Sequence, residues 1–169
     1  MQHVVVKVFD NELVQKNSSI NHDPLSEIHL QEKFSRSYSH LINPVMNHFR
    51  SETKEFVVSP FYKNGDLFEF IVKEICLTEQ QARKIMHRCC EALLVLHDNR
   101  ISHRDVSLEN FLLDDYALPL LTDFGVSKEM ENNFMIENTG PVGKKNYMAP
   151  EFSECQRFPF YDGRKIDVF

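Results

Sequence analysis

Three short polar motifs hold the residues whose types and spacing are suited to chemistry. In HRDVSLEN (103–110), the carboxylate of Asp105 can orient a hydroxyl group and accept its proton, and the amide of Asn110 can bind a metal ion. Thirteen residues after Asn110, Asp123 opens the tripeptide DFG, where its carboxylate can hold Mg²⁺. Each motif alone fits a solvated turn. Together with APE (149–151), in this order and spacing, they indicate a site for moving a phosphoryl group.

The elements that must position these motifs divide the chain into a strand-rich first part and a mainly helical second part. Strands are expected at 4–9, 44–49 and 55–59, and a helix from Leu25 to about Tyr38. The stretch YKNGDL (62–67) is typical of a turn followed by the start of a helix. The change between the two parts therefore falls near residues 62–66.

A second helix is the most strongly marked element of the sequence. Thr78 is a good N-cap, and Gln81 completes a capping box. Apolar residues at 82, 85, 86, 89, 93 and 96 then form one stripe that runs to His97. Two short strands are expected after it, FLL (111–113) and LLT (120–122).

Composition argues against several classes of protein. The chain has 169 residues, of which 42% are apolar and 26% charged, as in a globular domain. The net charge of -6 with scattered basic residues gives no reason to expect a nucleic-acid partner. No apolar run could span a bilayer and the start does not resemble a secretory signal, so we expect no membrane partner and a cytoplasmic location. Cys76, Cys89, Cys90 and Cys155 lack zinc-ligand spacing and are expected as reduced thiols in the core.

The motifs make the chain similar to the eukaryotic protein kinase family of the serine/threonine type. The signatures are H-R-D-x-x-x-x-N, D-F-G and A-P-E, and the resemblance covers nearly the whole chain. It implies an α+β fold of two lobes, a small β-rich N-lobe with one helix (1–61) and a mainly helical C-lobe (62–169). No glycine-rich loop precedes Lys7, and the helix that begins near Asp167 is cut short. We therefore expect a partial kinase domain, incomplete at both ends.

The resemblance also implies roles for the residues of the three motifs. Asp105 is the expected base-like catalytic residue, and Asn110 and Asp123 are the expected ligands of Mg²⁺ on the phosphates of ATP. Arg104 is expected to pair with a phosphate on the activation segment, where Thr139 is the candidate; mass spectrometry of the active protein would test this.

The first part of the chain would hold the nucleotide. VVVK resembles the strand whose lysine, here Lys7, grips the α- and β-phosphates. A helix glutamate should orient Lys7; Glu27 and Glu32 are both candidates, and the separation of 20 residues favours Glu27.

The stretch VVSPFYKNGDLFEF resembles the hinge between the lobes. Ser59 takes the gatekeeper position, Pro60 offers only a carbonyl to adenine, and Tyr62 offers an N–H. Asp66 is placed to bind the ribose and also fits the N-cap of the following helix. Besides Lys7 and Glu27, the residues assigned to the nucleotide are Val5, Pro60, Tyr62, Asp66 and Leu112.

Two positions depart from the family pattern. Serine/threonine members usually have lysine two residues after the catalytic aspartate and threonine shortly before A-P-E, and here these positions hold Ser107 and Lys144. In the family fold the two positions meet, so we expect Lys144 to reach Asp105 while Ser107 supplies the hydroxyl. Such an ion pair contributes up to about 4 kcal/mol before desolvation. The alternative is that Lys144 and Lys145 are surface charges and the site is impaired.

The resemblance implies an ATP-dependent enzyme that phosphorylates serine or threonine in a protein substrate. The alternative is a pseudokinase, a nucleotide-binding scaffold without transfer, which the serine at position 107 favours and the retained Lys7, Asp105, Asn110 and Asp123 oppose. A small-molecule kinase of related fold is a second alternative, but such enzymes generally lack A-P-E.

Overall fold

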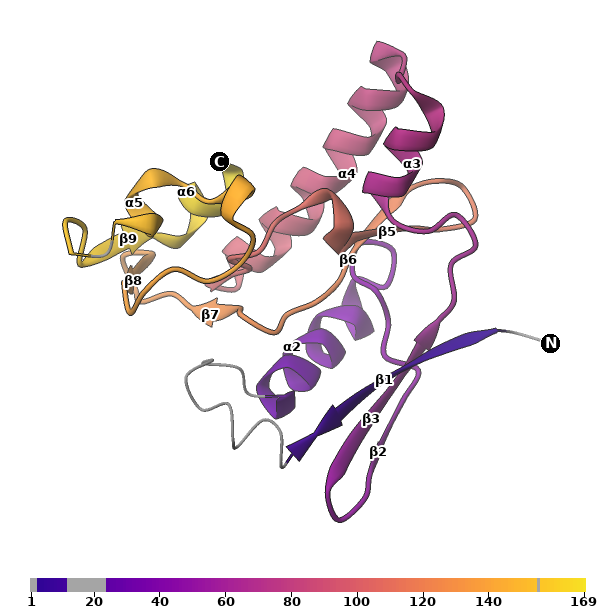
Figure 1. Cartoon of the computed structure of the whole chain (residues 1–169), viewed down its shortest axis with the longest axis horizontal. Coiled ribbons are helices and arrows are strands. Elements are labelled where there is room, and N and C mark those ends of the chain that lie inside the picture. The colour runs from indigo at the N-terminus through magenta and orange to yellow at the C-terminus, as the bar shows by residue number, and fades with distance from the viewer. Residues whose placement is uncertain (1–2, 12–23, 155) are drawn as a thin grey trace.

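The computed structural model describes residues 3–11, 24–154 and 156–169. Its first part is a three-stranded antiparallel sheet of β1 (Val4–Asp10), β2 (Asn47–Arg50) and β3 (Lys54–Pro60), in the order β1-β3-β2. Helix α2 (Pro24–Ser37) lies against one face of this sheet (Figure 1). Phe9, Ile28 and Val57 form a small apolar cluster between sheet and helix. The alternation of side chains along each strand therefore decides which residues face the helix.

The strand predicted at 44–49 begins three residues later than expected. Pro44 has no N–H to give to a ladder, and the pairing of β2 with β3 starts with Asn47 opposite Val58. Met46 still donates a backbone hydrogen bond to Val58 just ahead of the strand.

Two helices of unequal length begin the second part. Helix α3 (Leu67–Glu74) begins at Asp66, whose side chain accepts a hydrogen bond from the N–H of Glu69. Helix α4 (Glu79–Asp98) begins at the predicted capping box of Thr78 and Gln81. The predicted apolar stripe is wrong at one position, because Met86 is 59% exposed. The residues of α4 that are buried are Ile85, Cys89, Ala92, Leu93 and Leu96.

Short elements follow these helices along the chain. Three two-stranded ladders pair β4 (Ile101–Ser102) with β7 (Lys128–Glu129), β5 (Phe111–Leu113) with β6 (Pro119–Leu121), and β8 (Met135–Glu137) with β9 (Phe160–Asp162). The short helices are the 3₁₀ turns Leu108–Asn110 and Lys145–Tyr147, α5 (Pro150–Ser153) and α6 (Gly163–Val168). The strand predicted at 120–122 lies one residue earlier.

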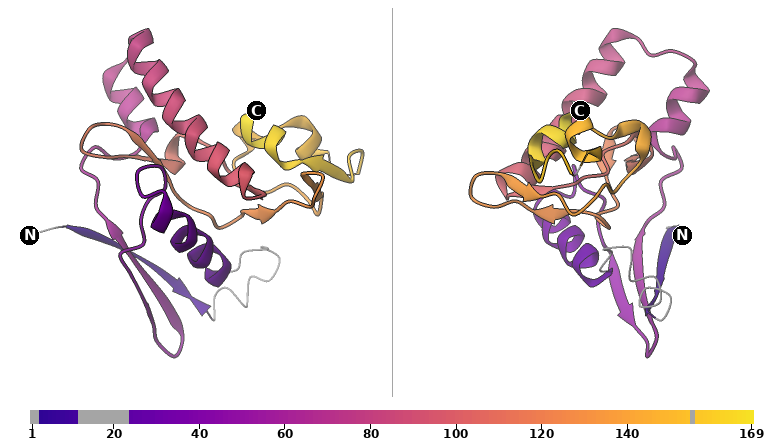
Figure 2. Two further views of the ribbon diagram at one scale, coloured as in Figure 1. Left: turned by 180° about the vertical axis from the view of Figure 1, so that it is seen from behind. Right: turned by 60° about the vertical axis from the view of Figure 1, so that its left-hand side comes forward.

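The main core joins the two lobes. Both views in Figure 2 place the sheet and α2 at one end of the molecule and α3 and α4 at the other. Phe34 of α2 and Phe124 of the DFG motif stack with ring centroids 6.5 Å apart and belong to the same buried cluster as Leu96 and Leu121. The tripeptide that carries Asp123 is thus packed against both lobes.

Of the three cysteines that the structure describes, one is buried and two are exposed. Cys89 is buried, which raises the pKa of its thiol to about 12, with a further contribution from neighbouring Cys90. Cys76 and Cys90 are exposed, so the expectation of core thiols is wrong for these two. Cys155 lies outside the described residues. Among the described helices, none has the length and apolar character that crossing a bilayer requires.

Candidate active site

Lys7 lies between two carboxylates from distant parts of the chain. Its Nζ is 2.5 Å from Oε1 of Glu27 on α2 and 3.1 Å from Oδ1 of Asp123 in the DFG motif. Lys7 faces α2 because it is paired with buried Val57 in the sheet register. Of the two candidate glutamates, Glu27 therefore contacts Lys7, whereas Glu32 makes an ion pair with Arg36.

Lys7 and Asp123 each favour the charged form of the other. Burial alone would lower the pKa of Lys7, but the carboxylates of Glu27 and Asp123 outweigh it and raise the pKa above its ordinary value. Burial alone would raise the pKa of Asp123, but the Lys7 ammonium outweighs it and holds the pKa below the usual range. Both groups are consequently charged at neutral pH.

The loop that carries Asp105 is held in place by hydrogen bonds to Asp167 of α6. Asp167, which is 3% exposed, accepts hydrogen bonds from the backbone N–H groups of His103 (2.9 Å) and Arg104 (2.8 Å). The same carboxylate lies 2.9 Å from Nε2 of His97 on α4. These contacts hold Arg104 at a positive φ of 65°, a conformation unusual for a residue with a side chain. The loop is therefore positioned by buried polar contacts.

Asp105 is surrounded by donors. Asn110 donates from Nδ2 to the backbone oxygen of Asp105 at 2.7 Å and to its Oδ2 at 2.8 Å. Lys144 donates from its backbone N–H to Oδ1 at 2.9 Å and from Nζ to Oδ2 at 3.0 Å. The Nζ of Lys144 also donates to Oγ of Ser107 at 2.9 Å. The ammonium thus lies between the aspartate and the serine, as the exchange of positions 107 and 144 predicts.

The two candidate metal ligands are joined through the backbone. Thr122, which precedes Asp123, donates its N–H to the carbonyl of Asn110 at 3.0 Å. Asn110 uses its Nδ2 to donate to Asp105, so the side-chain oxygen of Asn110 takes no part in these hydrogen bonds. A carboxylate and an amide oxygen are donors suited to Mg²⁺, which usually keeps several water ligands. The donor types therefore fit that ion.

A cavity of about 200 Å³ opens beside Lys7. Val5 and Leu112 line it, as do Ser59 and Pro60. Tyr62 and Asp66 do not line this cavity. Burial raises the pKa of the Tyr62 hydroxyl to about 12, with Asp114 and Asp115 adding to the effect. The remaining lining residues are Lys7, Glu27, Ile28, Gln31, Asn43, Val57 and Thr122.

Three polar residues that line this cavity, Gln31, Asn43 and Thr122, were not assigned a role from the sequence. Gln31 donates from Nε2 to the carbonyl of Asn43 at 2.9 Å, and Asn43 donates from Nδ2 to Oγ1 of Thr122 at 3.2 Å. Gln31 had one local signal, since it lies one helical turn after Glu27. Asn43 and Thr122 had none, because they come from segments 79 residues apart.

Arg104 points away from Asp105. Its Nε donates to the carbonyl of Val126 at 2.5 Å, and its Nη1 donates to the hydroxyl of Tyr161 at 3.3 Å. Burial raises the pKa of Tyr161, and the nearby Arg104 charge partly opposes this. Thr139 is exposed, and the phosphate expected to join it to Arg104 stays a prediction.

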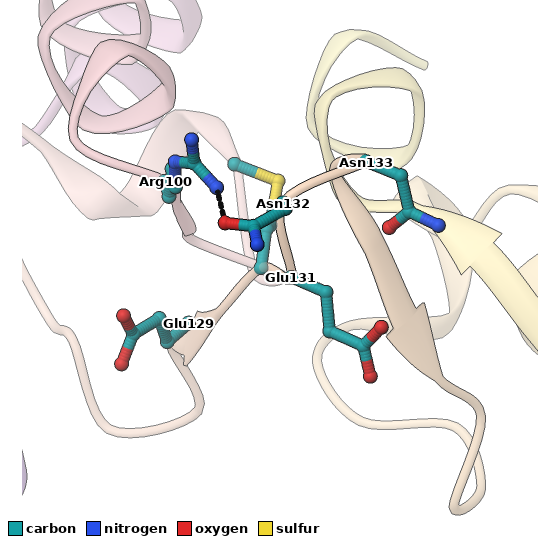
Figure 3. A pocket seen from close by; sticks show the side chains of 6 residues that line it. Arg100, Glu129, Glu131, Asn132 and Asn133 are labelled. Carbon is teal, nitrogen blue, oxygen red and sulfur yellow. Dashed lines mark hydrogen bonds between the residues drawn. The ribbon is translucent and has the colours of Figure 1, made fainter.

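A second hollow, of about 780 Å³, lies outside this site (Figure 3). It is open and polar, and Arg100 donates a hydrogen bond to Asn132 across it. Its other lining residues are Glu129, Met130, Glu131 and Asn133. None of the residues singled out in the sequence lines it, so the candidate site is formed by Lys7, Asp105 and the residues that contact them.

Comparison with known proteins identifies one family over the whole chain. The family model described as the protein kinase domain matches residues 1–169. The catalytic gamma chain of phosphorylase b kinase, liver/testis isoform, of Bos taurus is 29% identical over 183 residues, which cover 100% of this chain and 44% of the relative.

Two further similar proteins are named as protein kinases. A probable serine/threonine-protein kinase of Dictyostelium discoideum is 37% identical over 142 residues, covering 83% of this chain and 30% of the relative. The carbon catabolite-derepressing protein kinase of Secale cereale is 35% identical over 114 residues, covering 68% and 22%. The chain spans less than half the length of these relatives.

Proposed function

The chain belongs to the protein kinase family, and on this premise we propose that it transfers the γ-phosphoryl group of ATP to serine or threonine hydroxyl groups of protein substrates. The family membership supports phosphoryl transfer to protein. Similar proteins named as serine/threonine kinases support the choice of hydroxyl. The catalytic loop VSLEN, which lacks the A-A-R or R-A-A of tyrosine kinases, supports the same choice.

One observation carries the proposal: two charged clusters converge through the hydrogen bond from the Thr122 N–H, next to Asp123, to the carbonyl of Asn110, whose side chain binds Asp105. Lys7 joins Glu27 to Asp123 across the lobes, and Asp105 meets Lys144 in the loop beneath. Positioning and charge neutralisation supply most of the rate in phosphoryl transfer, so such a convergence is the main structural requirement.

The transfer step follows from the contacts of Asp105. Its carboxylate orients the substrate hydroxyl and accepts its proton, while the hydroxyl oxygen forms a bond to the γ-phosphorus. The bond between the γ-phosphorus and the bridging oxygen breaks, and ADP leaves with that oxygen. Lys144, whose Nζ is 3.0 Å from Oδ2 of Asp105, places a positive charge beside the group in transfer.

Other residues hold the nucleotide. Lys7 binds the α- and β-phosphates, and its contact with Glu27 keeps the ammonium in place. Asn110 and Asp123 would hold Mg²⁺, which neutralises charge on the phosphates when bound. Adenine would lie between Val5 and Leu112, two of the apolar residues that line the cavity. In the same proposal, Pro60 and Tyr62 meet the edge of the base and Asp66 meets the ribose.

A pseudokinase is the second candidate, because Ser107 takes the place of the usual lysine. A scaffold of this kind would bind nucleotide and transfer nothing. The position of the Lys144 ammonium at 2.9 Å from Oγ of Ser107 weighs against it, since the cation is supplied from another segment.

A transfer assay distinguishes the two candidates. The protein is incubated with Mg²⁺, γ-labelled ATP and peptide libraries that carry serine, threonine or tyrosine, and Asp105→Asn is assayed in parallel. We expect label on serine and threonine peptides and a loss of at least about 100-fold in kcat for the variant. Nucleotide binding without any transfer would establish the scaffold, and label on tyrosine alone would overturn the choice of substrate.

A further inference from the structure

The positive charge beside Asp105 comes from a segment at the surface. Lys144 belongs to the stretch between the DFG and APE motifs, and it binds both oxygens of the Asp105 carboxylate, one through its backbone and one through its ammonium. A residue outside the catalytic loop therefore supplies two of the donors around Asp105.

The backbone of the same segment lies directly on the catalytic loop. Gly143 has a φ of +84°, and a Cβ at this position would lie 2.6 Å from the carbonyl oxygen of Arg104 and 2.9 Å from Oδ1 of Asp105. Only glycine permits both this conformation and this approach. The glycine thus lets the next residue, Lys144, reach the carboxylate of Asp105.

Ser107 completes a receptor for the lysine side chain. The serine is 3% exposed and stands at the N-cap of the 3₁₀ turn 108–110, but its side chain makes no cap hydrogen bond. Its Oγ instead accepts from Nζ of Lys144 at 2.9 Å. Together Asp105 and Ser107 form what we call the lysine socket, with one charged and one neutral acceptor.

The segment that carries Lys144 is held less firmly than the socket. Residues 137–148 are all described by the structure, and none of them is buried. Partly buried Val142 and Met148 rest on a small apolar cluster, and Asn138 donates from Nδ2 to the carbonyl of Phe158 at 3.1 Å. Segments with few buried contacts open locally at low cost in free energy. When this one opens, the ammonium leaves with it.

We propose that Ser107 is a positioning residue for Lys144. We further propose that the lysine socket supplies the active site with its cation only while the activation segment, the stretch between the DFG and APE motifs, lies against the catalytic loop; this position of the segment is called seated. This inference rests on the proposed function and adds a mode of control to it. A lysine at position 107 belongs to the catalytic loop, so its ammonium would remain beside Asp105 whether the segment is seated or open. With the cation at position 144, seating of the segment and binding of the triphosphate stabilise each other, because such coupling is reciprocal.

The experiment moves the charge back into the catalytic loop. Lys144→Thr is compared with the double variant Ser107→Lys/Lys144→Thr, and Lys145→Ala removes the neighbouring exposed charge as a control. We expect Lys144→Thr to lower kcat at least about tenfold and to raise KM for ATP at least about threefold, the double variant to regain most of the loss, and the control to match the wild type.

Hydrogen exchange of the amides at 137–148 reports the seating directly. We expect a non-hydrolysable ATP analogue with Mg²⁺ to slow exchange at these amides at least about threefold in the wild type and not in the double variant. An active double variant whose segment is still protected by the analogue would overturn the coupling and leave the proposed function intact. A wild type without transfer would end the proposed function, while the exchange result would still decide the socket.

Ser107→Ala provides a test that does not require lysine to fit at position 107. We expect it to lower kcat several-fold in the wild type and to have no further effect when Lys144 is already threonine, as for two residues that act through one contact. If the two substitutions are instead additive in kcat, Ser107 acts independently of Lys144 and the socket is disproved.

Discussion

Asp123 has two partners at the scale of single residues. Its carboxylate contacts Lys7 at 3.1 Å, and in the proposed reaction it also holds Mg²⁺. The Asp123 and Lys7 side chains are 45% and 46% exposed, so water screens the pair and it adds little to folding free energy. The contact therefore positions the two groups more than it stabilises the fold.

The shifted pKa values of this pair give a prediction for stability against pH. The pKa of Asp123 is lowered from 3.8, so its contribution is complete above 3.8 and is lost as the pH falls through the folded-state value. The pKa of Lys7 is raised from 10.5, so its contribution is complete below 10.5 and is lost at still higher pH. The pair should thus stabilise the protein equally across the interval between these values.

Thermal unfolding of the wild type and Asp123→Asn checks this expectation. The difference in Tm should be small and constant from pH 5 to 9, at about 2–4 °C per kcal/mol of stabilisation for a chain of this length. The difference should shrink below pH 3.8. A difference that grows as the pH falls below 3.8 would show that Asp123 is not held as an anion.

The residues that could be predicted from the sequence are those whose signal is local. Asp105 and Asn110 lie within one loop, and Asp123 lies in a tripeptide with its own spacing. The partnership of Lys144 with Ser107 was also predictable, since two departures from one pattern compensate each other. Asn43 escaped prediction because its role depends on a contact with Thr122 that no local pattern records.

At the scale of elements, α6 determines the shape of the catalytic loop. Asp167 is 3% exposed, and its carboxylate accepts hydrogen bonds from the backbone N–H groups of His103 and Arg104. A short helix thereby fixes a loop that lies more than sixty residues earlier in the chain.

Removing this carboxylate should cost both stability and activity. Asp167→Ala leaves the N–H groups of His103 and Arg104 unpaired, which we expect to lower the free energy of unfolding by about 3 kcal/mol. Asp167→Asn keeps one acceptor oxygen and should lose less. Urea unfolding measures the change, and kcat should fall as Asp105 loses its support.

Asp115→Ala is the matched control for this series. Asp115 pairs with Lys63 at the surface, where their side chains are 78% and 70% exposed, so its loss should change the free energy of unfolding by less than about 1 kcal/mol. Equal destabilisation by Asp167→Ala and Asp115→Ala would mean that α6 does not support the loop.

Elements with a strong local code were predicted well. The capping box fixed the start of α4, and the run of β-branched residues at 4–9 predicted β1 to within one residue. The prediction failed where a residue's surroundings are set by packing, as for Met86, whose helical spacing suggests burial but which no described element covers.

At the scale of the whole molecule, a nucleotide in the proposed cleft would touch both lobes. Val5 and Lys7 belong to the sheet, and Leu112 belongs to β5 beneath it. The stacked Phe34 and Phe124 already join the lobes behind this cleft. A ligand that bridges the remaining side should stabilise the folded molecule as a unit, by about 2.7 kcal/mol at a concentration 100 times its Kd.

Two neighbouring valines allow this to be tested on one strand. Val5 and Val6 are each 48% exposed, but successive side chains of β1 point to opposite faces, and only Val5 lines the cavity. Val5→Trp should fill the adenine slot and abolish the rise in Tm caused by a non-hydrolysable ATP analogue with Mg²⁺. Val6→Trp adds the same bulk to the other face and should keep that rise. If both variants respond to the analogue as the wild type does, the nucleotide binds elsewhere, because a tryptophan at position 5 leaves no room between the sheet and Leu112.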